Sequence, residues 1–266
     1  MGKPMTRWNG HKAEIYRRSF SGACAGTGPA VVKWLVGRRV ADVGCGCGDF
    51  ARHAAAAGYE VLACDAEPAM VEIARSALAG RVGRVFVDSL PALAGFDDAS
   101  VDSAVANFVI NHVPDAKACL RGLGRITVGG GRIITTTWTA DFLPHRDAVV
   151  GALDAVGAGQ GASRAAPPPG GFERSVAGLA AANEQAGLVV ISAQTVTWDW
   201  ATTWEDYWAG MSGGIGSTGE RYLAHGAETR RRVAEQVRDR LSAYEAPGGR
   251  LVFPCSAALC VAEKRG

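Results

Sequence analysis

The sequence predicts an α/β fold built on a seven-stranded, mostly parallel sheet, and two patterns in its 266 residues carry this prediction. First, the short apolar run 39–43 leads into three glycines at every second position, Gly44, Gly46 and Gly48. Runs of this kind are typical of buried parallel strands. Second, similar runs recur along the chain with helical stretches between them. The strands that we expect are 39–43, 59–65, 84–91, 101–108, 129–138, 188–200 and 250–263.

The glycine turn at 44–48 has the properties of a nucleotide-cofactor site. Glycine lets the backbone turn sharply and approach a ligand, and the helix expected over 47–57 presents free N–H groups at its start. A dinucleotide fingerprint, Gly-x-Gly-x-x-Gly, needs a glycine at position 49, where this chain has Asp49. A carboxylate there would repel a pyrophosphate. A nicotinamide-dependent oxidoreductase is therefore the less favoured alternative.

An acidic residue also ends the second expected strand. Asp65 lies 17 residues past Gly48, and a carboxylate at this place can accept hydrogen bonds from two vicinal ribose hydroxyls. Pro68 then suits the first turn of a helix that runs to about Ala79. The order of these features is more specific than any one of them, and it favours a cofactor that contains a nucleoside.

The pattern Asp42-x-Gly44-x-Gly46-x-Gly48 resembles the first signature motif of class I S-adenosylmethionine-dependent methyltransferases. Segments 8–10, 111–115 and 247–251 make the chain similar to the ubiquinone/menaquinone-biosynthesis type, many members of which act on small molecules in secondary metabolism. The resemblance covers roughly the first half of the chain. It implies a Rossmann-like class I methyltransferase fold, S-adenosylmethionine as cofactor, and methyl transfer to a small molecule, as in antibiotic biosynthesis.

The same resemblance assigns residues to the cofactor, with Asp65 holding the ribose and Asp88 the adenine amino group. Where relatives often carry paired histidines, this chain has Asn111 and His112, so the role of such a pair is not carried over. A non-methylating relative that keeps the cofactor site is the other alternative. The assigned residues are Asp42, Gly44, Cys45, Gly46, Gly48, Asp65, Ala66, Met70, Asp88, Ser89, Leu90, Asn107 and Phe108.

The segments outside the core are expected to form a lid, because open α/β sheets bind ligands beyond the carboxyl ends of their strands. We expect an N-terminal lid helix in 1–26, the cofactor-binding core in 27–138, a lid insertion in 139–171, core again in 172–200, a helical cap in 201–249, and the last strand with the tail in 250–266.

The acceptor side is less defined, and whether O, N or C receives the methyl group stays open. A base is needed only for a nucleophile such as a phenol, and an imidazole with a reference pKa near 6.5 suits that task. The candidate catalytic residues are His112, His11 and His145. Candidate substrate contacts are Trp8, Tyr16, Trp138, Trp204, Tyr207 and Trp208, although the last three, at helical spacing, are more simply the buried stripe of a cap helix.

The composition of the chain limits the classes of partner that we expect. A net charge of +2 is too mild for a nucleic-acid partner, and the basic run 230–240 shares a helix with apolar residues, which predicts a solvated face. No run is long enough to span a bilayer or to act as a secretory signal. The seven cysteines are expected to be reduced thiols in a cytoplasmic protein without a metal site. A homodimer is left open.

Overall fold

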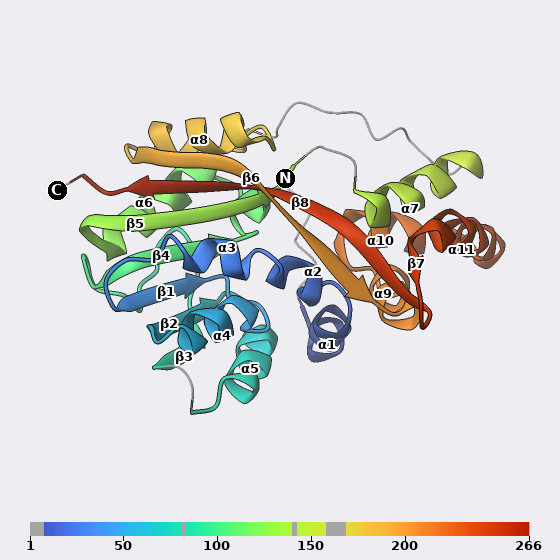
Figure 1. The fold of residues 1–266 in the computed structure, drawn as a ribbon, viewed down its shortest axis with the longest axis horizontal. Helices are drawn as coiled ribbons and strands as arrows, with labels where there is room; N and C mark the ends of the chain where they lie inside the picture. Colours follow the sequence, from blue (N-terminus) through green and yellow to red (C-terminus); the bar gives the residue numbers. More distant parts are fainter. Residues whose placement is uncertain (1–7, 81–82, 140–142, 158–168, 266) are drawn as a thin grey trace.

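The computed structural model describes residues 8–80, 83–139, 143–157 and 169–265, and Figure 1 shows a central twisted sheet with helices on both faces. The strand order is β3-β2-β1-β4-β5-β8-β6, with β7 paired to β8. Strands β1 to β5 pair in parallel, whereas β8 is antiparallel to both β5 and β6. The predicted mostly parallel sheet is confirmed. The strands are β1 (Arg39–Val43), β2 (Glu60–Asp65), β3 (Arg84–Val87), β4 (Val101–Asn107), β5 (Thr127–Trp138), β6 (Val189–Thr202), β7 (Glu245–Ala246) and β8 (Arg250–Glu263).

Alternate residues of the strands serve two separate cores, because side chains of a strand point to opposite faces. Ala41 and Val43 of β1 pack with α6, whereas Val40 packs with α3 and α4. This is the sandwich expected when both faces of a parallel sheet are covered. The helices of the sandwich are α3 (Gly28–Val32), α4 (Asp49–Ala56), α5 (Pro68–Ala77), α6 (Ala116–Ile126) and α8 (Val176–Gln185).

The N-terminal segment, which we predicted to form one lid helix, contains two helices. Helix α1 (Gly10–Arg18) begins at Asn9, whose side-chain oxygen accepts a hydrogen bond from the Lys12 amide at 2.8 Å. The chain leaves the helical conformation at Ser19, and α2 (Ser21–Ala25) follows. This break lets α2 turn toward the sheet while α1 stays at the rim (Figure 1).

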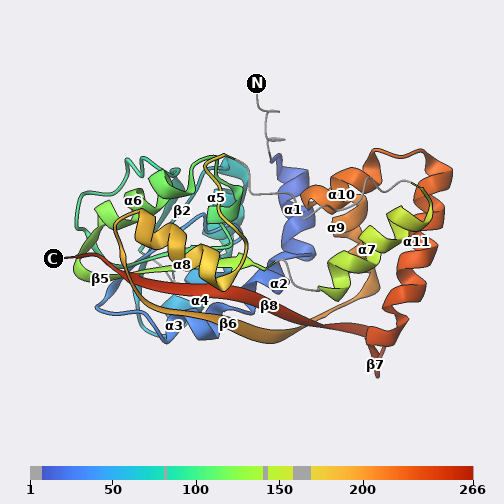
Figure 2. The same ribbon diagram turned by 90° about the horizontal axis from the view of Figure 1, so that it is seen from above.

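The remaining helices form a cap at the far end of the β6–β8 ladder (Figure 2). This ladder pairs Val189 with Glu263 at one end and Thr202 with Leu251 at the other, so it extends beyond the parallel part of the sheet. The predicted insertions therefore join in one cap, although residues 140–142 and 158–168 of the expected lid insertion lie outside the described residues. The cap helices are α7 (Pro144–Ala155), α9 (Trp204–Ser212), α10 (Gly216–Leu223) and α11 (Ala227–Leu241), and the 3₁₀ turns are η1 (Ile110–His112) and η2 (Ser242–Tyr244).

Two ion pairs connect the N-terminal helix to this cap. The Lys12 ammonium lies 3.8 Å from Glu220 of α10, and the Arg18 guanidinium lies 2.6 Å from Asp206 of α9. Because α1 also packs on the core through Ala13, which contacts Cys47 and Met70, it bridges the two halves of the molecule.

Other sequence predictions can be compared with the structure. All seven cysteines are free thiols, as predicted, and six of them are buried. Helix α11 buries Val233, Val237 and Leu241 and turns its arginines outward, which agrees with the predicted solvated face. In the described part of the chain, no helix combines the length and the apolar character needed to cross a bilayer.

Candidate functional site

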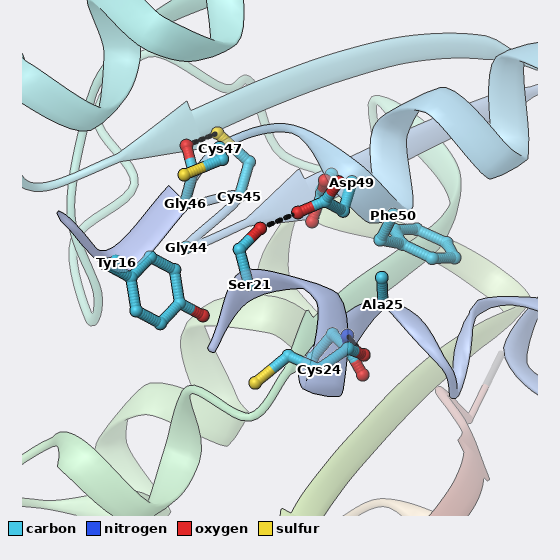
Figure 3. Close-up of a pocket in the computed structure, with 12 residues that line it drawn as sticks. Tyr16, Ser21, Cys24, Ala25, Gly44, Cys45, Gly46, Cys47, Asp49 and Phe50 are labelled. Carbon is cyan, nitrogen blue, oxygen red and sulfur yellow. Dashed lines mark hydrogen bonds between the residues drawn. The ribbon is translucent and has the colours of Figure 1, made fainter. Parts of the chain in front are cut away.

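A cavity lies between the glycine turn after β1, the end of β4, and the lid helices α1 and α2 (Figure 3). Its volume is about 40 Å³, well below the roughly 300–1,000 Å³ of small-molecule pockets. The cavity is therefore smaller than a ligand of cofactor size. Of the predicted residues, Tyr16, Asp42, Gly44, Cys45, Gly46 and Asn107 line the cavity. The sequence analysis did not select the other six residues that line the cavity, which are Ser21, Cys24, Ala25, Cys47, Asp49 and Phe50.

The glycine turn has the backbone that was expected of it. Gly44 and Gly46 have φ angles of +73° and +52°, which side chains rarely adopt. A Cβ atom on Gly44 would lie 2.5 Å from Val109, so that glycine is also required for packing. A Cβ atom on Gly46 would instead meet only Tyr16, at 3.9 Å. The turn thus leaves free space on the side of Gly46 that faces the lid.

Asp65 ties the end of β2 to this turn. One carboxylate oxygen accepts a hydrogen bond from the Gly46 amide at 2.9 Å, and the other accepts one from the Glu67 amide at 2.9 Å. Burial raises the pKa of this carboxyl, and the two amide donors oppose that rise. Each oxygen has a second lone pair for a ligand hydroxyl. Asp65 does not line the cavity itself, so its ribose contact remains a prediction.

Asp42 is the most buried acid of the site, with 1 % of its surface exposed. One of its oxygens accepts a hydrogen bond from the Ala51 amide at 3.0 Å, which fixes the first turn of α4 against β1. The pKa of Asp42 is raised to about 8, mainly by burial; the Ala51 amide opposes this rise, and the nearby acids Asp65 and Asp49 contribute to it.

This shift predicts a pH dependence of stability. Because the folded-state pKa of Asp42 lies above its ordinary value of 3.8, its protonated form favours folding at low pH. That contribution is lost as the pH rises through about 8. We expect the melting temperature to fall between pH 5 and pH 9 and to fall less in Asp42→Asn, whose amide keeps an acceptor for Ala51. Equal pH profiles of the two proteins in scanning calorimetry would contradict the assigned titration.

Asn107, the last residue of β4, connects the segment around α2 to the sheet through side-chain hydrogen bonds. Its side-chain oxygen accepts hydrogen bonds from the hydroxyls of Thr27, at 2.8 Å, and Thr136, at 2.6 Å. Its amide nitrogen donates to the carbonyl of Cys24 at 3.2 Å. These three hydrogen bonds hold the end of α2 against β4 and β5, and the second N–H of the amide remains available.

The other predicted cofactor residues lie at the same carboxyl edge of the sheet but outside the cavity. The Asp88 carboxylate accepts hydrogen bonds from the amides of Ser89, at 2.8 Å, and Gly95, at 2.8 Å, and so shapes its own loop after β3. Met70 is buried against α1, and Phe108, with a φ of +58°, packs on Trp138. Ala66 and Leu90 occupy the loops after β2 and β3, and Gly48 precedes α4.

None of the three candidate histidines lines the cavity. His11 is exposed on α1, and His112 is exposed in η1, where local desolvation and the charge of Arg174 lower its pKa. His145 is buried in the cap, where its ring packs against Trp138 and Trp200, and burial lowers its pKa to about 4. A base of that pKa is poorly matched to a phenol at neutral pH, so we do not retain His145 as a base.

The aromatic candidates divide into two groups. Tyr16 lines the cavity, and Trp8 packs edge-on against it with ring centroids 5.4 Å apart. Tyr207 is completely buried and donates a hydrogen bond to the His145 carbonyl at 2.6 Å, so it serves the cap core. Trp204 and Trp208 stack on each other in α9, with centroids 5.2 Å apart, and pack against the same core. The simpler interpretation of these three as a helix stripe that packs in the cap fits the structure, with Tyr207 fully buried, whereas the substrate contacts of the half-buried Trp204 and Trp208 stay a prediction.

Residues 41–135 match a family model described as a methyltransferase domain. This part of the chain is therefore similar to methyltransferase domains. The ubiquinone biosynthesis O-methyltransferase of Xanthomonas oryzae is 36% identical over 122 residues, which are 44% of this chain and 50% of that protein. The chain thus spans about half the length of the curated relatives it matches.

Solved structures extend the likeness to almost the whole chain. A structure from work on the conversion of a disulfide bond into a thioacetal group during echinomycin biosynthesis has a TM-score of 0.59 at 16% identity, covering 95% of this chain and 91% of that one. Phosphoethanolamine N-methyltransferase 2 of Haemonchus contortus, in complex with S-adenosyl-L-methionine, has a TM-score of 0.56 at 16% identity, covering 98% of this chain and 58% of the other. At these identities the likeness shows the fold, which confirms the predicted class I methyltransferase architecture.

Proposed function

We propose that this chain is an S-adenosylmethionine-dependent methyltransferase that acts on a small molecule in secondary metabolism. The observation that carries the proposal is the cavity at the carboxyl edge of β1 and β4, bordered by an open glycine turn and by Asp42, in a methyltransferase domain. The described lining residues include no Lys, Arg or His, which suits a cationic ligand and disfavours a pyrophosphate. The Haemonchus contortus relative in complex with this cofactor supports the assignment.

The residues of the chain provide binding, orientation and exclusion of water. When bound, the cofactor supplies an electrophilic methyl group on a sulfonium. Asp65 would hold the ribose hydroxyls, while the turn around Gly46 gives the ligand room to approach the backbone. Helices α1 and α2 would close over the ligand, with Tyr16 forming part of the wall. Positioning of this kind accounts for much of the rate of a bimolecular displacement.

The acceptor would lie on an aromatic wall beside the cavity. Phe108, directly after the cavity residue Asn107, stacks on Trp138 with centroids 4.5 Å apart. Trp198 contacts Trp138 with centroids 5.6 Å apart, and both tryptophans are partly exposed. Trp198 was missed because its strand showed no motif. Such a wall fits a planar acceptor, since aromatic rings offer large contact areas at low entropic cost.

This wall can be tested with Trp138→Leu, which keeps an apolar side chain but removes the stacking surface. We expect KM for the acceptor to rise about three- to tenfold, corresponding to a lost aromatic contact, with unchanged affinity for S-adenosylhomocysteine. Trp204→Leu is the matched control, because it removes a stacked tryptophan from the cap without touching the wall. Equal KM changes in the two variants would assign Trp138 to packing only.

The proposed function itself is tested by binding first and turnover second. Titration calorimetry should show binding of S-adenosylhomocysteine and S-adenosylmethionine and none of NADH. A screen of phenols, amines and quinone precursors, with formation of S-adenosylhomocysteine as the readout, then identifies the acceptor class. Binding of NADH alone would replace the proposal with the oxidoreductase alternative. Binding of S-adenosylmethionine without turnover on any acceptor would favour the non-methylating alternative.

A further inference from the structure

Two acids, Asp42 and Asp49, line the described wall of the cavity, and no basic side chain among the described residues does. Burial, which raises the pKa of Asp42 to about 8, leaves that carboxyl largely neutral at pH 7. Asp49 does have an arginine partner, because the Arg52 guanidinium lies 2.7 Å from one of its oxygens. Arg52 belongs to the outer face of α4, with 44% of its side chain exposed, and does not reach the cavity. Water screens an exposed cation of this kind, so the carboxylate keeps most of its effect on the interior.

Asp49 is held in place from two sides. It is the first residue of α4, and the Ser21 hydroxyl of α2 donates a hydrogen bond to its second oxygen (Figure 3). Only 22% of the Asp49 side chain is exposed. Ser21 therefore fixes the carboxylate at the point where the lid meets the glycine turn. This charge has no part in the family signature quoted above, and packing alone gives no reason for it.

We propose that Asp49 makes the cofactor site selective for the cationic methyl donor over its neutral thioether product. The inference rests on the proposed function. Transfer breaks the bond between the methyl carbon and sulfur, the electron pair stays on sulfur, and a bond forms between the methyl carbon and the acceptor. The donor thereby loses its sulfonium charge. A nearby carboxylate attracts the donor more than the product, and partial burial strengthens this difference.

This selectivity has a consequence for turnover. The donor and the product share their adenosine and amino-acid groups, so contacts to these groups bind both molecules equally. The two molecules differ in the transferred methyl group and in the charge on sulfur, and the charge is the difference that a carboxylate recognises. The charge of Asp49 therefore favours replacement of product by fresh donor.

The test compares dissociation constants of S-adenosylmethionine and S-adenosylhomocysteine by calorimetry at pH 7 in wild type, Asp49→Asn, Asp49→Glu and Ser21→Ala. Wild type should bind the donor about tenfold more tightly than the product. Asp49→Asn should lose this preference by weakening donor binding, whereas Asp49→Glu, which keeps the charge, should retain it. Ser21→Ala is the matched control, because it removes the same lid hydrogen bond and leaves the charge.

Two results would overturn the inference: a preference that survives in Asp49→Asn, or equal weakening of donor and product in that variant. The second result would assign Asp49 to the amino group that both molecules share. If the Asn variant fails to fold, Asp49→Ser, which also removes the charge, takes its place in the comparison, and a preference that survives in it overturns the inference in the same way. Failure of wild type to bind either nucleoside would instead contradict the proposed function.

Discussion

Replacing Gly46 by valine should lower the affinity for S-adenosylhomocysteine by more than about a hundredfold while leaving the fold intact. A Cβ at this position would approach only Tyr16, at 3.9 Å, which is an ordinary van der Waals contact, so the turn itself accommodates a Cβ atom. The valine methyl groups would fill the gap between the turn and Tyr16, where we expect the ligand to approach the backbone. The cost therefore arises in the complex rather than in the free protein.

A second effect of the substitution must be separated from the first. The φ of Gly46 is +52°, and a side chain in that region costs roughly 1–2 kcal/mol. Gly58→Val is the matched control, because Gly58 ends α4 with a φ of +92° and its Cβ would also meet no atom within 4 Å. Both variants should lose similar stability in thermal unfolding, but only the first should lose affinity in calorimetry. Normal binding by Gly46→Val would make the turn a purely structural feature.

The fold could be predicted well because each strand of the sheet corresponds to a clear pattern in the sequence. Parallel strands are buried on both faces and appear as continuous apolar runs, and the first strand was predicted at 39–43, where the parallel strand β1 lies. Helix boundaries were less accurate. We expected a helix from Cys47, but α4 begins at Asp49, because Gly48 has a φ of +83° and cannot belong to it.

The site could be predicted only where it coincides with a local pattern. Asp42 and Asn107 lie in the last residues of β1 and β4, the glycine turn follows β1, and all of them were found there. Helix α2 places Ser21, Cys24 and Ala25 at the cavity. Its position depends on the end of α1 at Ser19 and on the hydrogen bond from Asn107 to Cys24, a long-range contact that leaves no signal in the sequence. Asp49 was noticed only as a residue that excludes a dinucleotide, although its position beside three glycines was a usable signal.

The contacts of the aromatic residues in the cap could not be predicted for the same reason. Helical spacing of Trp204, Tyr207 and Trp208 predicts an apolar stripe, but it cannot tell whether that stripe faces a ligand or another helix. The structure decides this because Tyr207 bonds to His145 inside the cap. Periodicity fixes which residues share a face, and tertiary packing fixes what that face touches.

Removing the Asp65 carboxylate should weaken cofactor binding about ten- to a hundredfold, which corresponds to the loss of charge-assisted hydrogen bonds of about 1.5–3 kcal/mol. The structure adds an indirect contribution to this direct one. In Asp65→Ala the Gly46 amide also loses its partner, so the turn itself becomes less ordered. In Asp65→Asn the amide oxygen can still accept one backbone hydrogen bond, but the negative charge offered to the ribose hydroxyls is lost. We therefore expect the affinity to decrease in the order wild type, Asn variant, Ala variant.

Asp102→Ala is the control that separates a ribose contact from a backbone support. The Asp102 carboxylate accepts hydrogen bonds from the amides of Arg38, at 2.7 Å, and Arg39, at 2.8 Å, and it lies away from the cavity. Its loss should lower the melting temperature about as much as the loss of Asp65, with unchanged affinity for S-adenosylhomocysteine. If both alanine variants bind the ligand like wild type, Asp65 only holds the turn. If affinity falls in Asp65→Ala while Asp65→Asn binds like wild type, the charge is dispensable and the effect acts through the turn. A graded loss confined to the Asp65 variants assigns the carboxylate to the ribose.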